Sequence, residues 1–130
     1  MGHYRKILES QPGNLFALNN LAASLAEEAN GLDEALKIAQ RAEELGRDNA
    51  GIDDTLGWVL YKKGMHSTAV EYLRSSVKRE PNATRHAHLA ILYADRGDKT
   101  HAIEELSAAI ALNASHPEVK HAVQRLATMK

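Results

Sequence analysis

One short stretch, residues 54–64, carries side chains of the types and spacing that a binding surface needs. Its acid, two aromatic rings and base recur at i, i+4, i+7 and i+8, which places them on one face of a helix. They are Asp54, Trp58, Tyr61 and Lys62. Trp58 is the one tryptophan of the 130 residues, and buried aromatic side chains are favoured anchors in binding interfaces. The stretch therefore predicts a recognition surface.

The sequence lacks the patterns of catalytic and metal sites. No two of its histidines stand at i, i+4 with a carboxylate between them, which is the spacing of a helical zinc site. The seven are His3, His66, His86, His88, His101, His116 and His121. There is no cysteine, no G-x-S-x-G and no phosphate-binding glycine loop. We expect no enzyme activity, no metal and no cofactor, and we interpret the histidines as ordinary surface and packing residues.

Composition and charge exclude several other classes of partner. The net charge is -1, so no global field attracts nucleic acid or an anionic membrane. No run of about 18 apolar residues is present, and we expect no membrane insertion of this segment. We expect a soluble segment, whether cytoplasmic or in a bacterial envelope or periplasm. The absence of cysteine leaves the redox compartment open.

Apolar residues recur at spacings of three and four almost throughout, which predicts an all-α chain. Proline and glycine divide it into short helices. The expected helices cover residues 4–10, 15–29, 32–45, 50–63, 67–79, 83–96, 99–112 and 117–129.

The helices repeat in pairs. Leu21-Ala22, Leu56-Gly57 and Leu89-Ala90 correspond to one another at spacings of 33 to 35 residues. One helix hairpin per period of this length indicates a stacked solenoid. The small residue of each pair is expected where the two helices of a hairpin cross, because a larger side chain would force them apart.

These motifs resemble the tetratricopeptide repeat (TPR) family, whose pattern is W-x2-L-G-x2-Y, then A-x3-F, then P. The second repeat fits best, with Asp53, Leu56-Gly57 and Leu60, followed by Ala69, Leu73 and Pro81. The resemblance implies a right-handed α-α superhelical solenoid of antiparallel helix hairpins. It also divides the chain: residues 4–12 are the second helix of a truncated repeat, 14–49, 50–82 and 83–115 are three repeats, and 116–130 are a C-terminal capping helix or the first helix of a cut repeat.

In this family the first helices of successive repeats line a concave groove that binds partners. The matching positions here are Asn19, Ala23, Glu27, Asp54, Trp58, Tyr61, Lys62, His88, Ile91 and Asp95. Trp58 lies between the small residues Ala23 and Ala87, where it either anchors a peptide side chain or only fills space between helices. We interpret Tyr61 as a packing residue, and Asp54 and Lys62 as solvated charges.

The resemblance implies a protein–protein interaction scaffold that holds a peptide or protein segment of unknown identity. A carboxylate clamp for chaperone tails is not expected, because only Asn19 matches its pattern. One alternative is structural assembly, with a homo-oligomer formed through the open solenoid ends, since exposed apolar patches attract partners. Another is the recruiting segment of a larger enzyme. Residues 54–61 also resemble repeats common in bacterial proteins, including envelope and exopolysaccharide-export systems.

Overall fold

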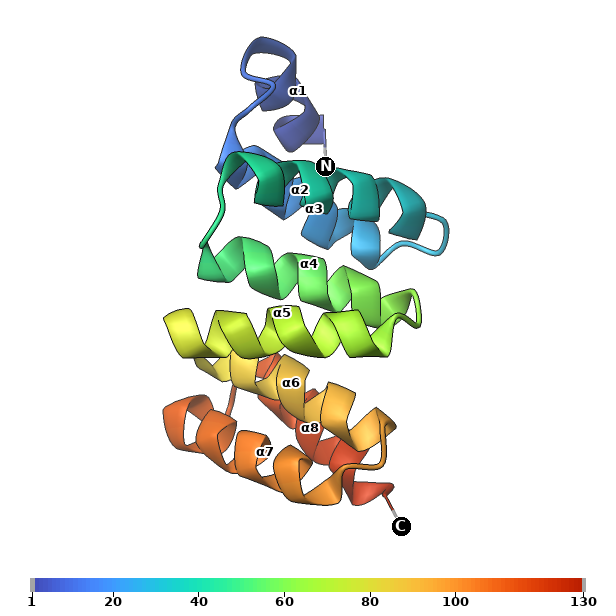
Figure 1. The fold of residues 1–130 in the computed structure, drawn as a ribbon, viewed down its shortest axis with the longest axis vertical. Coiled ribbons are helices and arrows are strands. Elements are labelled where there is room, and N and C mark those ends of the chain that lie inside the picture. The colour runs from blue at the N-terminus through green and yellow to red at the C-terminus, as the bar shows by residue number, and fades with distance from the viewer. Residues whose placement is uncertain (1, 130) are drawn as a thin grey trace.

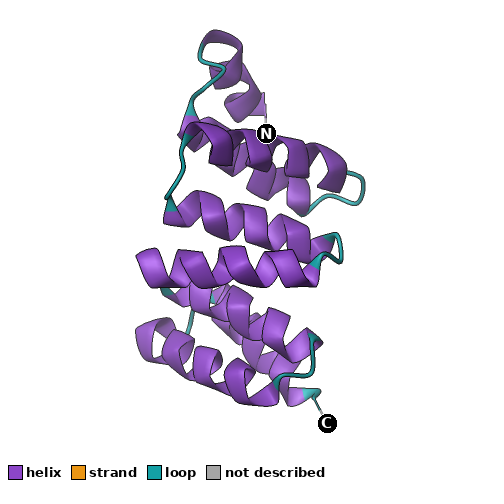
Figure 2. Cartoon of the chain, in the orientation of Figure 1, coloured by secondary structure: helices purple, strands orange, loops and turns teal. Residues whose placement is uncertain are grey.

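The structure, a computed structural model, describes residues 2–129, and every regular element within that range is a helix (Figure 2). The eight helices are α1 (Gly2–Ser10), α2 (Leu15–Ala26), α3 (Leu32–Leu45), α4 (Ala50–Lys62), α5 (His66–Arg79), α6 (Ala83–Asp95), α7 (Lys99–Asn113) and α8 (Pro117–Ala127). None of these helices combines the length and the apolar character that crossing a membrane requires.

The three hairpins follow one another in chain order along the long axis, and α8 packs against α6 and α7 (Figure 1). Within residues 2–129, α2–α3, α4–α5 and α6–α7 form antiparallel hairpins. The first helices contact one another along the stack, as α2 with α4 and α4 with α6, and α6 also contacts α8. The second helices α3, α5 and α7 contact the following first helix but not one another. The expected all-α solenoid is confirmed, while its division into repeats at residues 14, 50, 83 and 116 stays a proposal.

Helices α2, α4 and α6 begin in the same way. The side chain of an asparagine accepts a hydrogen bond from the backbone N–H three residues later, at 2.9 Å for Asn14, 3.0 Å for Asn49 and 2.8 Å for Asn82. This contact satisfies one of the N–H groups that a helix start leaves without a partner. In α8 the imidazole of His116 replaces the asparagine and accepts from the Glu118 N–H at 3.0 Å. The caps give α2, α4, α6 and α8 corresponding start points, at residues 14, 49, 82 and 116.

The expected helix 15–29 ends earlier, at Ala26. Residues 27–31 instead form successive turns, in which the N–H groups of Glu28 and Gly31 donate to Leu25 and Glu28. The loop returns so tightly that a Cβ at Gly31 would lie 2.1 Å from the Leu25 carbonyl oxygen. The first hairpin is therefore closed by a compact loop rather than by a longer helix.

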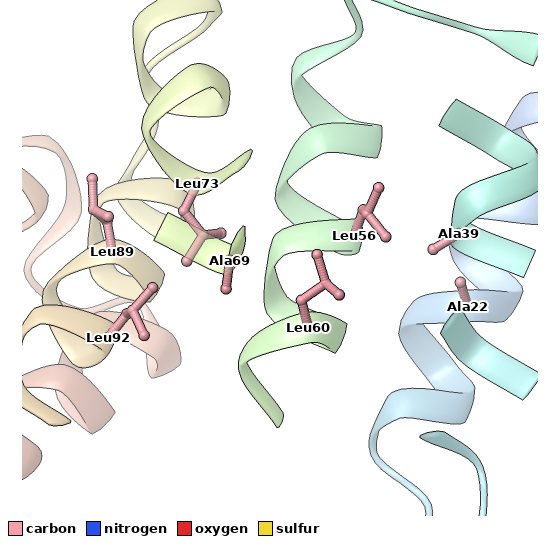
Figure 3. Packing of buried hydrophobic residues seen from close by; sticks show 8 residues of the cluster. All are labelled: Ala22, Ala39, Leu56, Leu60, Ala69, Leu73, Leu89 and Leu92. Atoms are coloured by element: carbon pink, nitrogen blue, oxygen red, sulfur yellow. The ribbon is translucent and has the colours of Figure 1, made fainter. Parts of the chain in front are cut away.

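The core lies between the two helix layers and is built from leucine and alanine (Figure 3). One cluster extends from the first hairpin to the third and contains Ala22, Ala39, Leu56, Leu60, Ala69, Leu73, Leu89 and Leu92. The helices α4 and α5 cross closely, because a Cβ at Gly57 would lie 2.8 Å from Leu73 Cδ2 and 3.2 Å from the Leu73 backbone nitrogen. The small residue at this crossing sets the distance between the two helices.

We expect Gly57→Ala to lower the free energy of unfolding by about 1–3 kcal/mol, because the added methyl group overpacks the crossing against Leu73. The matched control is Gly51→Ala in the same helix, where the nearest atoms to an added Cβ are 3.4 Å away or farther. That variant keeps or slightly raises stability, since alanine favours helix more than glycine does. Urea unfolding measures both, and equal stabilities would contradict the close approach.

Candidate binding groove

The first helices form a groove with two recesses that share Trp58 as a wall. The first, here called the Ala23 recess, has a volume of about 480 Å³, and its apolar lining comes from Ala23, Ala26, Trp58 and Val59. The second, here called the Arg125 recess, has a volume of about 460 Å³ and lies on the side of Tyr61, Lys62 and Arg125. Glu27 and Glu118 line both recesses. The groove therefore draws residues from α2, α4, α6 and α8.

His88 links three helices beneath Trp58. Its Nδ1 lies 2.9 Å from a carboxylate oxygen of Asp54 on α4, and its Nε2 lies 3.5 Å from a carboxylate oxygen of Glu118 on α8. The imidazole stacks on the indole of Trp58, with ring centroids 4.0 Å apart and an angle of 15° between the planes. His88 is only 7% exposed. This one residue of α6 therefore positions both flanking first helices and the central aromatic ring.

Burial disfavours the charged form of His88, but Asp54 and Glu118 outweigh it and raise the pKa of His88 to about 9. The hydrogen bond from His88 in turn holds the pKa of Glu118 below its ordinary value, against the opposing effect of burial. Because the pKa of His88 is raised on folding, its charge stabilises the fold fully below about pH 6.5. This contribution is lost as the pH rises through about 9.

Tyr61 stacks on the other aromatic groups of the groove and bonds to α6. Its ring lies 4.7 Å from that of Trp58 and 5.3 Å from that of His66, both stacked. Its hydroxyl donates to Asp95, and Asp95 also pairs with Arg125 of α8 at 2.6 Å. Burial, followed by the Asp95 carboxylate, raises the pKa of Tyr61 to about 12. Tyr61 therefore remains a neutral donor in the groove.

Lys62 closes the groove toward α2. Its ammonium lies 3.1 Å from a carboxylate oxygen of Glu27, 3.4 Å from the carbonyl oxygen of Ala26 and 5.9 Å from the ring centroid of Trp58. The interpretation of Lys62 and Asp54 as solvated charges is wrong, since Lys62 pairs with Glu27 and Asp54 with His88. The side chains of Asp54 and Lys62 are 14% and 26% exposed.

The structure brings together eight of the ten residues that the sequence assigns to the groove. Each of the eight lines one or both recesses: Ala23, Glu27, Asp54, Trp58, Tyr61, Lys62, His88 and Asp95. Asn19 lines neither recess, and its amide oxygen is buried with no hydrogen-bond partner among the described residues. Within residues 2–129, no three histidine, aspartate or glutamate side chains are grouped as a metal site requires.

The assignment of Ile91 to the groove surface is wrong. Ile91 is 1% exposed and lies in an apolar cluster with Val119 and Ala122 of α8. This helix packs on α6 and covers the position that the family pattern leaves open. In exchange α8 contributes groove residues that sequence reasoning missed, including Glu118 and Arg125. The position of each residue relative to its helix cap could have identified Arg125. It stands nine residues after His116, as Trp58 stands nine residues after Asn49.

We predict that His88 stays charged well above the ordinary imidazole range. NMR titration of its ring resonances should give a midpoint near pH 9, and Asp54→Asn should shift that midpoint downward because one of the two carboxylates is lost. The matched control is Glu105→Gln, which removes the carboxylate that contacts His86 rather than His88. A wild-type midpoint near 6.5, or no effect of Asp54→Asn, would refute the charged bridge.

These features define a class of protein, a solenoid of antiparallel helix hairpins with a groove along its first helices. No family model matches the chain. The TPR repeat-containing protein PA4667 of Pseudomonas aeruginosa is 34% identical over 85 residues, which cover 65% of this chain and 14% of that protein. In fold and repeat pattern the chain is similar to tetratricopeptide repeat proteins.

Solved structures agree on the fold. TTC0263, a thermophilic TPR protein of Thermus thermophilus, gives a TM-score of 0.80 at 18% identity, covering 95% of this chain and 70% of that one. YrrB, described as a TPR protein with an unusual peptide-binding site, gives 0.75 at 22% identity, covering 92% and 61%. PcrH, solved with the chaperone binding region of PopB, gives 0.70 at 23% identity, covering 89% and 94%.

Proposed function

We propose that this chain is a non-catalytic interaction scaffold that holds a peptide or protein segment in the groove of its first helices. The observation that carries the proposal is Trp58, a half-buried aromatic side chain that separates two recesses of several hundred cubic ångströms each. The Ala23 recess has the size and apolar floor that bind one side chain or a short segment. YrrB and PcrH support the proposal, since each is described with a bound segment or a peptide-binding site.

The partner segment enters the groove and places an apolar side chain in the Ala23 recess, against Trp58. The recess wall is preorganised, because His88 and Tyr61 already stack on the indole and hold it in place. Binding therefore requires little ordering of the protein side chains, which lowers the entropic cost of association. Residues at the centre of such a contact contribute most of the binding energy.

The first test of this function uses a random 12-residue peptide library displayed on phage, selected on the whole chain. We expect peptides enriched on the wild type to lose about 30-fold or more in affinity on Trp58→Ala, since a central aromatic anchor is worth about 2 kcal/mol or more. Far-UV circular dichroism and thermal unfolding establish that the variant is folded.

A second variant keeps this test decisive if Trp58→Ala unfolds the chain. Ala23→Arg fills the recess from an exposed position and leaves the core and the Trp58 stack intact. Its matched control is Ala111→Arg, at an exposed alanine of α7 outside both recesses. Selected peptides that bind Ala23→Arg as tightly as the wild type would show that the groove is not the binding site.

A second candidate function is self-association through α8, and one observation favours it. The residue seven positions after each cap is buried in the hairpins, as Leu21, Leu56 and Leu89 at 2%, 3% and 1% exposure. In α8 the same register position is Val123, which is 43% exposed. Within residues 2–129 no second helix covers it. The roles as an enzyme-recruiting or export segment have no such observation in their favour.

For this second candidate function, we expect self-association to depend on Val123. Light scattering or sedimentation velocity should show a concentration-dependent dimer for the wild type and a monomer for Val123→Glu, because a buried carboxylate opposes the apolar contact. The matched control is Val70→Glu, which should disturb the packing of one hairpin rather than the α8 surface. A wild type that stays monomeric at its highest attainable concentration excludes this candidate.

A further inference from the structure

The Ala23 recess combines an apolar floor with an acidic rim. Ala23, Ala26 and Val59 form apolar lining, and three carboxylates line the same recess, those of Glu27, Asp54 and Glu118. The one cationic group in that lining is His88. Carboxylates therefore outnumber cations three to one around a space of about 480 Å³.

The charged side chains that line the Ala23 recess differ in how exposed they are to solvent. His88 lies beneath the surface and is only 7% exposed. It pairs with the carboxylate of Asp54, whose side chain is 14% exposed. The side chains of Glu27 and Glu118 are 65% and 38% exposed, so their carboxylates dominate the mouth of the recess. An approaching segment therefore meets two exposed carboxylates, of which Glu27 is paired with Lys62, before it reaches the apolar floor. Such a field steers positively charged groups toward the groove and disfavours acidic ones.

The chain's own cations show which ligand chemistry this groove stabilises. The His88 imidazolium lies between the Asp54 and Glu118 carboxylates and stacks on Trp58. The Lys62 ammonium lies near the Glu27 carboxylate and the Ala26 carbonyl, 5.9 Å from the Trp58 centroid. An ammonium within about 6 Å of an indole ring and beside a carboxylate is a favourable cation arrangement. Both internal cations use the same elements, a carboxylate and the Trp58 ring.

We propose that the groove recognises a basic partner segment, one in which a lysine or arginine stands next to an apolar residue. The apolar side chain occupies the Ala23 recess, and the basic side chain displaces Lys62 from Glu27 at the rim. This inference rests on the proposed function and adds the chemical class of the partner. Lys62 is then a resident competitor, which holds the rim until the partner arrives.

Because Lys62 lies at the rim, the proposal predicts the direction in which each rim substitution changes peptide affinity. If the partner is basic, Lys62→Gln removes a competing charge and strengthens binding, whereas Glu27→Gln removes an attracting charge and weakens it. If the partner is acidic, both effects reverse, because Lys62 would then be the attracting group. A single pair of variants therefore separates the two partner classes.

The experiment uses the random 12-residue phage library on the whole chain, followed by titration of the most enriched synthetic peptide by calorimetry. We expect lysine and arginine beside an aliphatic residue to be enriched. Glu27→Gln should weaken binding and Lys62→Gln should strengthen it, each by roughly two- to fivefold, the size of an exposed ion pair. Added salt should weaken wild-type binding, since it screens exposed charges.

The matched control is Glu71→Gln, an exposed carboxylate of α5 that lines neither recess, and it should leave the affinity unchanged. Enrichment of aspartate and glutamate, reversed effects of the two rim variants, or no effect of either would overturn the basic-partner inference and leave groove binding standing. Enriched peptides that bind Ala23→Arg normally, or the absence of any enrichment, would overturn groove binding itself.

Discussion

The structure depends on the close approach of two helices at Gly57. The backbone of α4 contacts Leu73 of α5 so closely that even one methyl group has no room. This spacing lets Leu56, Leu60 and Leu73 form one cluster with residues of the neighbouring hairpins. Because interiors tolerate little change in volume, the crossing distance of one hairpin constrains how the next one packs. We infer that small residues at these crossings help to determine how successive hairpins pack.

A second constraint acts in the groove itself. A buried ion pair adds little to the free energy of unfolding, because removing charges from water is costly. It does, however, require its partners to keep a defined geometry. His88 satisfies two carboxylates only if α4, α6 and α8 keep their relative positions. The stack on Trp58 adds a directional contact to the same arrangement. We infer that this polar cluster maintains a defined recess on a surface that alanine packing alone would leave less defined.

The fold could be predicted from the sequence because it rests on local rules that repeat. Glycine and proline positions, the 3.6-residue apolar pattern and a period of 33 to 35 residues are all visible in the chain. The end of α2 was missed because turns after Ala26 satisfy the backbone before the helical pattern runs out. The end of a helix depends on competition between helical and turn hydrogen bonds, and the spacing of apolar residues does not predict its outcome.

The site was predictable only in part, for a physical reason. The family pattern placed Trp58, Asp54 and His88 on the groove side, and the structure puts all three in the Ala23 recess. The pattern treats each repeat alone, however, whereas burial and pairing depend on the neighbours. Ile91 is covered by α8, and Asp54 pairs with His88 across 34 residues of sequence. A charge pattern on one helix does not reveal such long-range partners.

We propose that partners bind the face built from the first helices. The most direct measurement is a ¹H–¹⁵N chemical-shift map of the whole chain, recorded with and without a peptide selected from the random library. We expect the largest shifts in α2, α4, α6 and α8, centred on the Trp58 indole N–H and the Ala23 amide. Shifts centred on α3, α5 and α7, with the Trp58 indole unmoved, would contradict it.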